Sequence, residues 1–284
     1  MQFIDSHTHL WLKGAITQEM RENSARVGYE IPVLEKEKVI KEMDEANLEY
    51  VVIIAYPMRK LWGAKEDFPV RMIQECKDYP DRFSVVGGVE VNQLTLEETR
   101  NWLETQYSAG VSGFKLHPPH MWVKPNDYRE EESGLKQLEL LYQFSQDHGL
   151  PVIIHTGTSF FLPARNKYGD PIYLDDVSVD FPKLKIVMAH LGRPNWVDTA
   201  FQLLRIRRNV MGDLSSIPPK RLLEYFPRLG EVEEKVVYGS DSGGPGVKGL
   251  KTHLEEFLRT GLQDSSKVKI AYENPKRVFR TLER

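Results

Sequence analysis

Two histidines near the N-terminus have the type and spacing that could hold a metal ion. In the run DSHTH, Asp5, His7 and His9 occupy alternate positions. If this run is a β-strand, alternate side chains project from one face, so the two imidazoles lie close enough to share an ion. Such a pair also occurs by accident on a surface or in a core, so further ligands are needed to indicate a metal centre.

Further candidate ligands stand at the ends of other apolar runs. His155 ends the run LPVIIHT, His190 ends LKIVMAH, and Asp241 ends KVVYGSD. Several imidazoles with one carboxylate suit zinc, and manganese, iron and cobalt also accept such ligands. The alternative, a rim of polar residues without a ligand, is disfavoured because burying unpaired imidazoles costs free energy.

The run SDSGGPG, residues 240–246, suggests a different kind of catalysis, because it looks like the nucleophile loop of a trypsin-like serine protease. His190 and Asp213 even precede Ser242 in the order that those enzymes use. Such proteases are all-β and rely on several disulfides, whereas this chain has one cysteine. We therefore predict that Asp241 is the functional residue of the run and that Ser242 is a turn residue.

The elements that must position these residues are short apolar runs separated by helical segments. Several of the runs are apolar throughout, as expected of parallel strands that are covered on both faces. The predicted strands are residues 2–7, 50–56, 83–91, 112–117, 150–156, 184–190, 209–215 and 235–241.

Helices are predicted between most of these strands. Amphipathic or capped segments span residues 35–48, 95–110 and 133–149, and a weaker helical pattern spans 170–182. Strands and helices that alternate in this way predict a single (β/α)8 TIM barrel, formed as one domain by residues 1–284. The active site of such a barrel lies where the strands end, which is where the candidate ligands stand.

The composition indicates an ordinary globular protein. Hydrophobic residues make up 40% and charged residues 28% of the 284 residues, and the net charge is −3. No basic stripe suggests nucleic acid, and no apolar run is long enough for a membrane helix. The N-terminal residues lack the features of a signal peptide, so we expect a cytoplasmic location and no membrane or nucleic-acid partner.

Five motifs, in order along the chain, resemble the amidohydrolase superfamily, in particular the branch called amidohydrolase type 2. They are IDSHTHLW, IIHTG, MAHLG, YGSD and ENPKRVF. The resemblance implies that His7, His9 and His155 bind one divalent metal ion, with zinc as the first candidate. It also implies that Asp241 is both a ligand and the group that takes a proton from the activated water, and that His190 is a ligand or an acid/base.

Lys115 and several residues near the predicted mouth are candidates for other roles. Some relatives carry a carboxylated lysine at the position of Lys115, where it bridges two metal ions, but we favour a plain lysine that neutralises a substrate carboxylate. Arg193 follows the His190 strand and could grip a carboxylate with two hydrogen bonds. The other candidates for substrate contact are Trp11, Tyr56, Arg59, His117, Trp122 and Arg165.

The favoured function is hydrolysis of a C–N or C–O bond in a small substrate, with a carboxylate-bearing molecule as one candidate. The resemblance also implies two alternatives on the same metal site: non-oxidative decarboxylation of an unsaturated or aromatic carboxylic acid, and hydration. A metal-binding barrel without catalysis is a further alternative. Homodimers are common among such barrels, so a dimer is one expected state of assembly.

Overall fold

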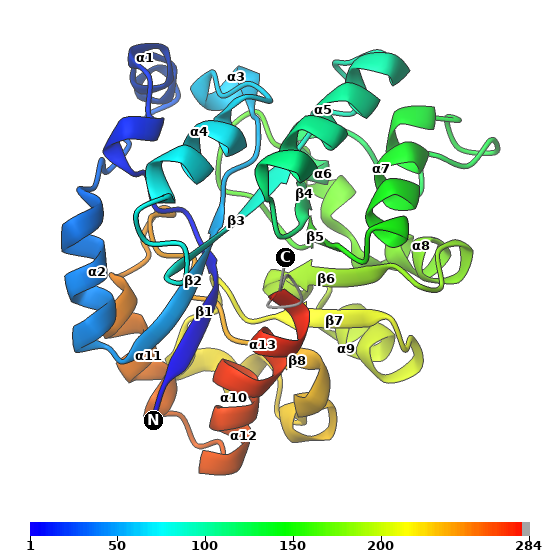
Figure 1. Cartoon of the computed structure of the whole chain (residues 1–284). Helices are drawn as coiled ribbons and strands as arrows, with labels where there is room; N and C mark the ends of the chain where they lie inside the picture. Colours follow the sequence, from blue (N-terminus) through cyan, green and yellow to red (C-terminus); the bar gives the residue numbers. More distant parts are fainter. Residues whose placement is uncertain (280–284) are drawn as a thin grey trace.

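The computed structural model describes residues 1–279, and these residues form an eight-stranded parallel sheet that closes on itself. Figure 1 shows the strands as a central ring and the helices around it. This confirms the predicted (β/α)8 barrel. The strands are β1 Phe3–Thr8, β2 Leu48–Ile54, β3 Phe83–Gly88, β4 Phe114–Leu116, β5 Pro151–His155, β6 Lys185–Ala189, β7 Val210–Asp213 and β8 Val236–Val237.

Each strand pairs with the next along the chain, from β1 to β8. The last strand meets the first through backbone hydrogen bonds: the Ser6 amide donates to the Tyr238 carbonyl at 2.9 Å, and the Asp241 amide donates to the His7 carbonyl at 2.8 Å. The apolar residues of the strands below these bonds, such as Ile4, Val236 and Val237, are buried because both faces of the strands are covered. Closure therefore brings the end of β1 directly beside the segment that follows β8.

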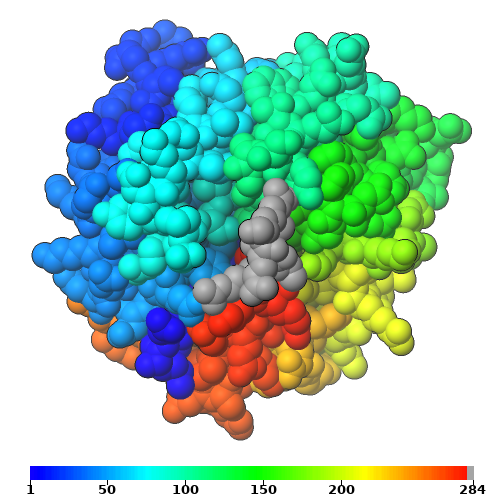
Figure 2. Space-filling view, viewed as in Figure 1, coloured from blue at the N-terminus to red at the C-terminus, as the bar shows by residue number. Residues whose placement is uncertain are grey.

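Helices cover the outside of the barrel in chain order. The colours in Figure 2 run around the molecule from blue through green to red, so successive strand–helix units are neighbours. The α-helices are α1 Gln18–Arg26, α2 Lys36–Glu45, α3 Arg59–Trp62, α4 Phe68–Cys76, α5 Leu96–Ala109, α6 Pro118–Met121, α7 Lys136–Asp147, α8 Leu174–Asp180, α9 Val197–Ile206, α10 Leu222–Tyr225, α11 Leu250–Leu258, α12 Asp264–Val268 and α13 Asn274–Phe279.

Short turns of other helix types join these elements. They are 3-10 helices at η1 Lys13–Ala15, η2 Asn166–Gly169, η3 Pro171–Tyr173, η4 His190–Gly192, η5 Pro219–Arg221 and η6 Leu229–Lys235, and a π-helix at η7 Lys269–Glu273. No helix among residues 1–279 combines the length and the apolar character needed to cross a lipid bilayer.

The helix signals in the sequence are confirmed at α5 and need correction at α7. Thr95 and Glu98 form the predicted capping box, and α5 ends at Gly110, whose φ is 105°. The helix predicted from residue 133 begins only at Lys136, because the Ser133 hydroxyl bonds to the carbonyl of Asp127 instead of to the helix amides.

Other predicted boundaries also differ from the structure. Leu48 starts β2 and does not extend α2, which ends at Glu45. The weak helix over 170–182 is divided into η3 and α8, because prolines flank it and break the pattern. The eighth strand is shorter than predicted, and the chain after Val237 runs as loop into the site.

Candidate active site

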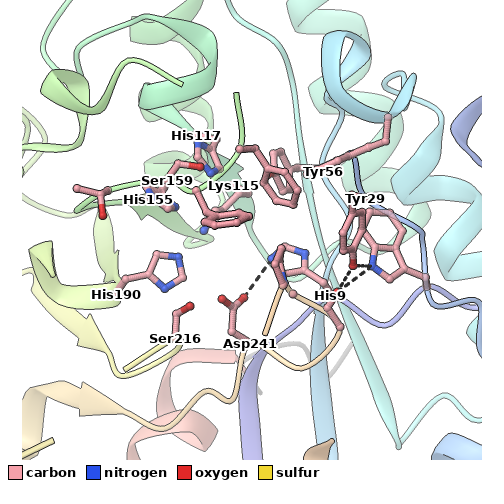
Figure 3. A pocket seen from close by; sticks show the side chains of 18 of the residues that line it. His9, Tyr29, Tyr56, Lys115, His117, His155, Ser159, His190, Ser216 and Asp241 are labelled. Atoms are coloured by element: carbon pink, nitrogen blue, oxygen red, sulfur yellow. Dashed lines mark hydrogen bonds and ion pairs between the residues drawn. The ribbon is translucent and has the colours of Figure 1, made fainter. Parts of the chain in front are cut away.

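One cavity lies at the carboxyl ends of the strands and collects most of the predicted site residues. Its volume is about 110 Å³, several times the roughly 10–15 Å³ that one water needs, so it admits a small molecule. Figure 3 shows Lys115 and Asp241 between His155 and His190 on one side and Tyr29 and Tyr56 on the other. It is lined by His9, Trp11, Tyr29, Tyr56, Trp62, Lys115, His117, His155, Thr158, Ser159, Phe160, Phe161, His190, Arg193, Ser216, Asp241, Gly243, Gly244 and Pro245.

His7, His9 and Asp241 form the candidate metal centre. Asp241 Oδ1 lies 3.6 Å from His7 Nε2 and 3.3 Å from His9 Nε2, and the three ligand atoms lie within 4.8 Å of one another. Among residues 1–279 this is the group of three or more histidine, cysteine or acidic side chains with such spacing. Two imidazole nitrogens and a carboxylate oxygen around one point fit a divalent cation.

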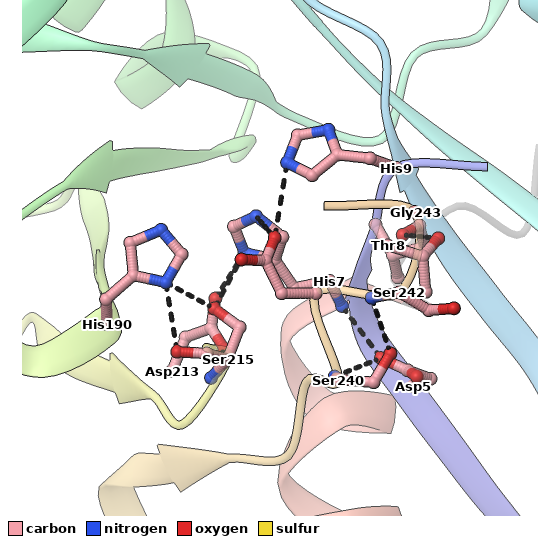
Figure 4. Close-up of polar contacts among 12 residues, drawn as sticks. Asp5, His7, Thr8, His9, His190, Asp213, Ser215, Ser240, Ser242 and Gly243 are labelled. Carbon is pink, nitrogen blue, oxygen red and sulfur yellow. Dashed lines mark hydrogen bonds and ion pairs between the residues drawn. The ribbon is translucent and has the colours of Figure 1, made fainter. Parts of the chain in front are cut away.

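His7 is oriented from behind by Asp213, at the end of β7. Asp213 Oδ2 lies 2.5 Å from His7 Nδ1, and both side chains are buried (Figure 4). Since an ionised carboxylate only accepts hydrogen bonds, Nδ1 carries the proton. His7 Nε2, which has no hydrogen-bond partner within the described chain, is then the bare nitrogen that coordination requires.

His190 is held in the same way by the backbone of Ser215. Its Nδ1 lies 3.0 Å from the carbonyl oxygen of Ser215, which can only accept, so Nδ1 donates. The ring lies on the cavity, and its Nε2 is therefore the lone-pair nitrogen. Ser215 Oγ lies 3.2 Å from His7 Nδ1 and 3.0 Å from His190 Nδ1, which ties the two rings to one segment after β7.

His155 lies in a row of imidazoles that continues from the candidate metal centre. Its ring centroid is 4.6 Å from that of His190 and 4.0 Å from that of His117, on which it stacks. Its Nε2 is buried without a hydrogen-bond partner in residues 1–279. His155 therefore lies near His7, His9 and Asp241 and has a nitrogen that is free to bind a ligand. It is not part of the group whose ligand atoms all lie within 4.8 Å of one another.

Burial controls the charge of the histidines. It lowers the pKa of His7, and it lowers the pKa values of His155 and His190 well below the ordinary value. These imidazoles are therefore neutral at pH 7, the state in which they bind metal ions.

Asp241, in contrast to these neutral histidines, is charged at pH 7. Burial alone would raise its pKa, but the hydrogen bond with His9 and the neighbouring rings of His190 and His7 outweigh burial and hold the pKa well below its usual range. Its backbone φ of 66° lies in the left-handed region, as do those of His190 (66°) and Leu191 (46°). Such backbone costs about 1–3 kcal/mol per residue and occurs where the surrounding structure fixes a functional side chain.

Two cations face the cavity without a carboxylate partner. Lys115 is 1% exposed and its Nζ has no hydrogen-bond partner among the described residues; Arg193 Nε is likewise unpaired there. Burial lowers the pKa of Lys115 to about 8, with Asp213 and Asp241 opposing the shift. Lys115 is therefore still mostly protonated at pH 7.

The remaining substrate candidates divide into two sets. Trp11, Tyr56 and His117 line the cavity, as Arg193 does. The other set, Arg59, Trp122 and Arg165, lies outside the lining that the described residues form.

The residues outside the lining have other partners. Arg59 pairs with Glu66 and lies 3.4 Å from Glu90, two buried carboxylates. The Arg165 guanidinium stacks over the Trp122 ring at 4.1 Å. The position of a residue in a loop does not indicate whether its side chain already binds another residue or is available to contact a substrate.

Several residues of the site were not predicted from the sequence. Asp213 was considered only because His190, Asp213 and Ser242 follow one another in the order of a trypsin-like protease. Its position near the end of a predicted strand could have indicated a role in the site. Tyr29 lies between α1 and α2, Trp62 ends the short helix α3, and Phe161 lies between β5 and η2. No spacing in the sequence indicated that these side chains point into the cavity.

A family model described as amidohydrolase matches residues 4–281. The chain belongs to the amidohydrolase family. Members of this family are metal-dependent enzymes that act on small molecules, and the His7, His9 and Asp241 group fits that requirement. No curated protein matches the chain by sequence.

Solved structures show the same fold at low identity. An uncharacterized TIM-barrel protein from Bordetella bronchiseptica has a TM-score of 0.75 at 22% identity, over 99% of both chains. A 2,6-dihydroxybenzoate decarboxylase from Rhizobium has a TM-score of 0.66 at 15% identity, again over 99% of both. A 4-oxalomesaconate hydratase from Rhodopseudomonas palustris has 0.65 at 16%, over 98% of this chain and 96% of the other.

Proposed function

We propose that this amidohydrolase is a hydrolase that uses one divalent metal ion, with zinc as the first candidate, to cleave a C–N or C–O bond in a small carboxylate. His7, His9 and Asp241 would hold the ion, and His155 and His190 are the further candidate ligands. A divalent ion bound there lowers the pKa of water and polarises a carbonyl group. What the protein's own residues do follows from their protonation states.

The observation that carries the proposal is that two proton acceptors lie on the cavity. Asp241 is ionised at neutral pH, and His190 presents a lone-pair Nε2 because Ser215 fixes the proton on Nδ1. Hydrolysis needs a group that takes a proton from water and later gives it to the leaving group. Asp241 at the metal centre and His190 beside it meet that need.

Lys115 and Arg193 support a substrate with a carboxylate. Both are cations on the cavity wall, and among the described residues neither Lys115 Nζ nor Arg193 Nε has a hydrogen-bond partner. A substrate carboxylate would neutralise them and would hold the scissile bond towards Asp241. A plain, mostly protonated Lys115 suits this role, which favours one metal ion over two.

The same two cations favour non-oxidative decarboxylation as the second candidate. A decarboxylase must orient a carboxylate and then protonate the carbon that loses CO₂. Structural relatives include a 2,6-dihydroxybenzoate decarboxylase and a 4-oxalomesaconate hydratase. We rank this reaction second because His190 presents an acceptor, not a proton donor, to the cavity.

A label experiment separates the two reactions. Zinc-loaded protein is screened against small lactones, esters, amides and unsaturated carboxylic acids in water enriched in oxygen-18 and, separately, in deuterium oxide. We expect one oxygen-18 in the product of each good substrate and no CO₂. Stoichiometric CO₂, with deuterium on the product carbon, would replace the hydrolase proposal with the decarboxylase.

A further inference from the structure

We propose that the Tyr56 hydroxyl donates a hydrogen bond to the substrate oxygen that becomes negative during the reaction. The proposal deepens the proposed function and rests on it for the place of the substrate in the cavity. Tyr56 lines this cavity together with Asp241 and His190. It adds a neutral hydrogen-bond donor to the two proton acceptors of the site and is therefore a candidate catalytic residue.

The backbone places Tyr56 at the mouth of the barrel, directly after β2. The Ala55 amide donates to the Val86 carbonyl at 2.9 Å, so β2 stays bonded to β3 up to the residue before Tyr56. A Cβ on Gly88, at the end of β3, would lie 3.0 Å from Tyr56 Cβ and 2.9 Å from the Lys115 carbonyl oxygen. The lack of a side chain at Gly88 therefore lets Tyr56 pack close to the ends of β3 and β4.

Three neighbouring rings hold the Tyr56 side chain in one orientation. Its ring stacks on that of His117, with centroids 5.8 Å apart and planes at 18°. The rings of His9 and Trp62 contact it edge-on, each with its centroid 6.2 Å away. Because His9 is a candidate metal ligand, Tyr56 lies beside the candidate metal centre.

The Tyr56 hydroxyl differs from those of the other buried tyrosines, because it has no hydrogen-bond partner among residues 1–279. The others bond within the fold: Tyr50 to the Pro275 carbonyl at 3.4 Å, Tyr128 to Asp180 Oδ2 at 2.6 Å, Tyr142 to the Pro125 carbonyl at 2.9 Å, and Tyr238 to His253 Nδ1 at 2.9 Å. A buried tyrosine hydroxyl ordinarily has a partner, so the exception at Tyr56 indicates one from outside the chain.

The cavity is where this partner must bind. Tyr56 is 3% exposed and lines the cavity. Its hydroxyl oxygen is not one of the fully buried side-chain atoms that lack a partner, so it accounts for part of this small exposed surface. A molecule in the cavity is therefore in reach of the hydroxyl.

The hydroxyl donates a hydrogen bond without giving up its proton. Burial raises the pKa of Tyr56 above its ordinary value, and the charges of Asp241 and Glu90 raise it further. Figure 3 shows His190 on the opposite side of the cavity from Tyr56. A substrate between them has a proton acceptor on one side and, on the other, a fixed donor for the oxygen on which negative charge develops.

Binding of two anions tests the donor without turnover. Methylphosphonate has a tetrahedral anionic centre, as the intermediate of acyl hydrolysis has, whereas planar acetate probes the carboxylate site at Lys115 and Arg193. Both are titrated by calorimetry into the parent and into Tyr56→Phe, after elemental analysis has shown equal metal content. We expect Tyr56→Phe to bind methylphosphonate at least about tenfold more weakly, the loss of one hydrogen bond to a charged group, and acetate within about twofold of the parent.

Tyr142→Phe is the matched control, because it removes a buried hydroxyl that is bonded within the fold. It should leave both affinities unchanged and lower the melting temperature by about 2–4 °C, whereas Tyr56→Phe should not lower it. The proposal is overturned if the parent does not bind methylphosphonate, if Tyr56→Phe binds it as the parent does, or if Tyr56→Phe loses both anions equally. Because no reaction is followed, a labelling result that contradicts the hydrolase proposal leaves this test unaffected.

Discussion

Asp213 Oδ2 lies 2.5 Å from Nδ1 of His7, across the gap between the ends of β7 and β1. This pair fixes which nitrogen of His7 faces Asp241. It also links the candidate metal centre to a residue that does not line the cavity, because the Asp213 carboxylate contacts the His7 ring and accepts from the Ser215 amide.

Loss of Asp213 should weaken metal binding more than it changes the fold. Asp213→Ala should lower zinc affinity by about 10–100-fold, the usual effect of removing a carboxylate that orients a histidine ligand. Asp213→Asn, whose amide oxygen can still accept from Nδ1, should recover part of this loss. Competition with a chromophoric chelator measures both; an unchanged affinity in Asp213→Ala would remove Asp213 from the metal centre.

Asp241 should be essential to turnover, and Ser242 should not. With a substrate found in the screen, Asp241→Asn should reduce kcat by roughly 10²–10⁴, the range for a lost general base. Ser242→Ala is the control, since Ser242 lies outside the cavity lining that residues 1–279 provide. Loss of activity in Ser242→Ala with full activity in Asp241→Asn would reverse the two roles.

Lys115 should make stability depend on pH in the alkaline range. In the folded state its pKa is about 8, against 10.5 when unfolded, so between these values the unfolded chain holds the extra proton. The free energy of unfolding should therefore rise with pH over this window, by about 3 kcal/mol in total relative to Lys115→Met. Urea unfolding of both metal-free proteins at pH 8 and 10.5 measures the difference, and parallel curves would contradict it.

Two glycines in the loop after β8 give a matched pair for testing its packing. A Cβ on Gly243 would lie 1.9 Å from the carbonyl oxygen of His9, whereas a Cβ on Gly246 would meet nothing within 4 Å. Both have positive φ, so Gly246→Ala should cost about 1 kcal/mol from backbone strain alone. Gly243→Ala should cost clearly more and should also weaken metal binding, because it displaces His9. Equal costs would show that the loop moves freely.

The sequence predicted the barrel and the order of its strands because these depend on local patterns, whereas the ends of several strands differ from the prediction. His7, His9, His155, His190 and Asp241 could be placed together because parallel strands of one barrel all end on the same face. The apolar runs also predicted which segments are buried.

Contacts between loops could not be predicted in this way. Tyr29 reaches the cavity from the long segment after β1, and its hydroxyl bonds to Gly243, which is distant in sequence. Arg165 and Trp122 were candidates for substrate contact but stack on each other. Such contacts depend on how loops pack in three dimensions, and neither periodicity nor motif spacing carries that information.

Metal content tests the central claim most directly. Protein purified without chelators is analysed for its elements beside the double variant His7→Ala/His9→Ala, with His120→Ala as a control histidine that lies outside the cavity lining. We expect about one equivalent of divalent metal in the parent and in the control, and nearly complete loss in the double variant, because the double variant lacks two of the three grouped ligands. Equal metal content in the parent and in a folded double variant would contradict the account.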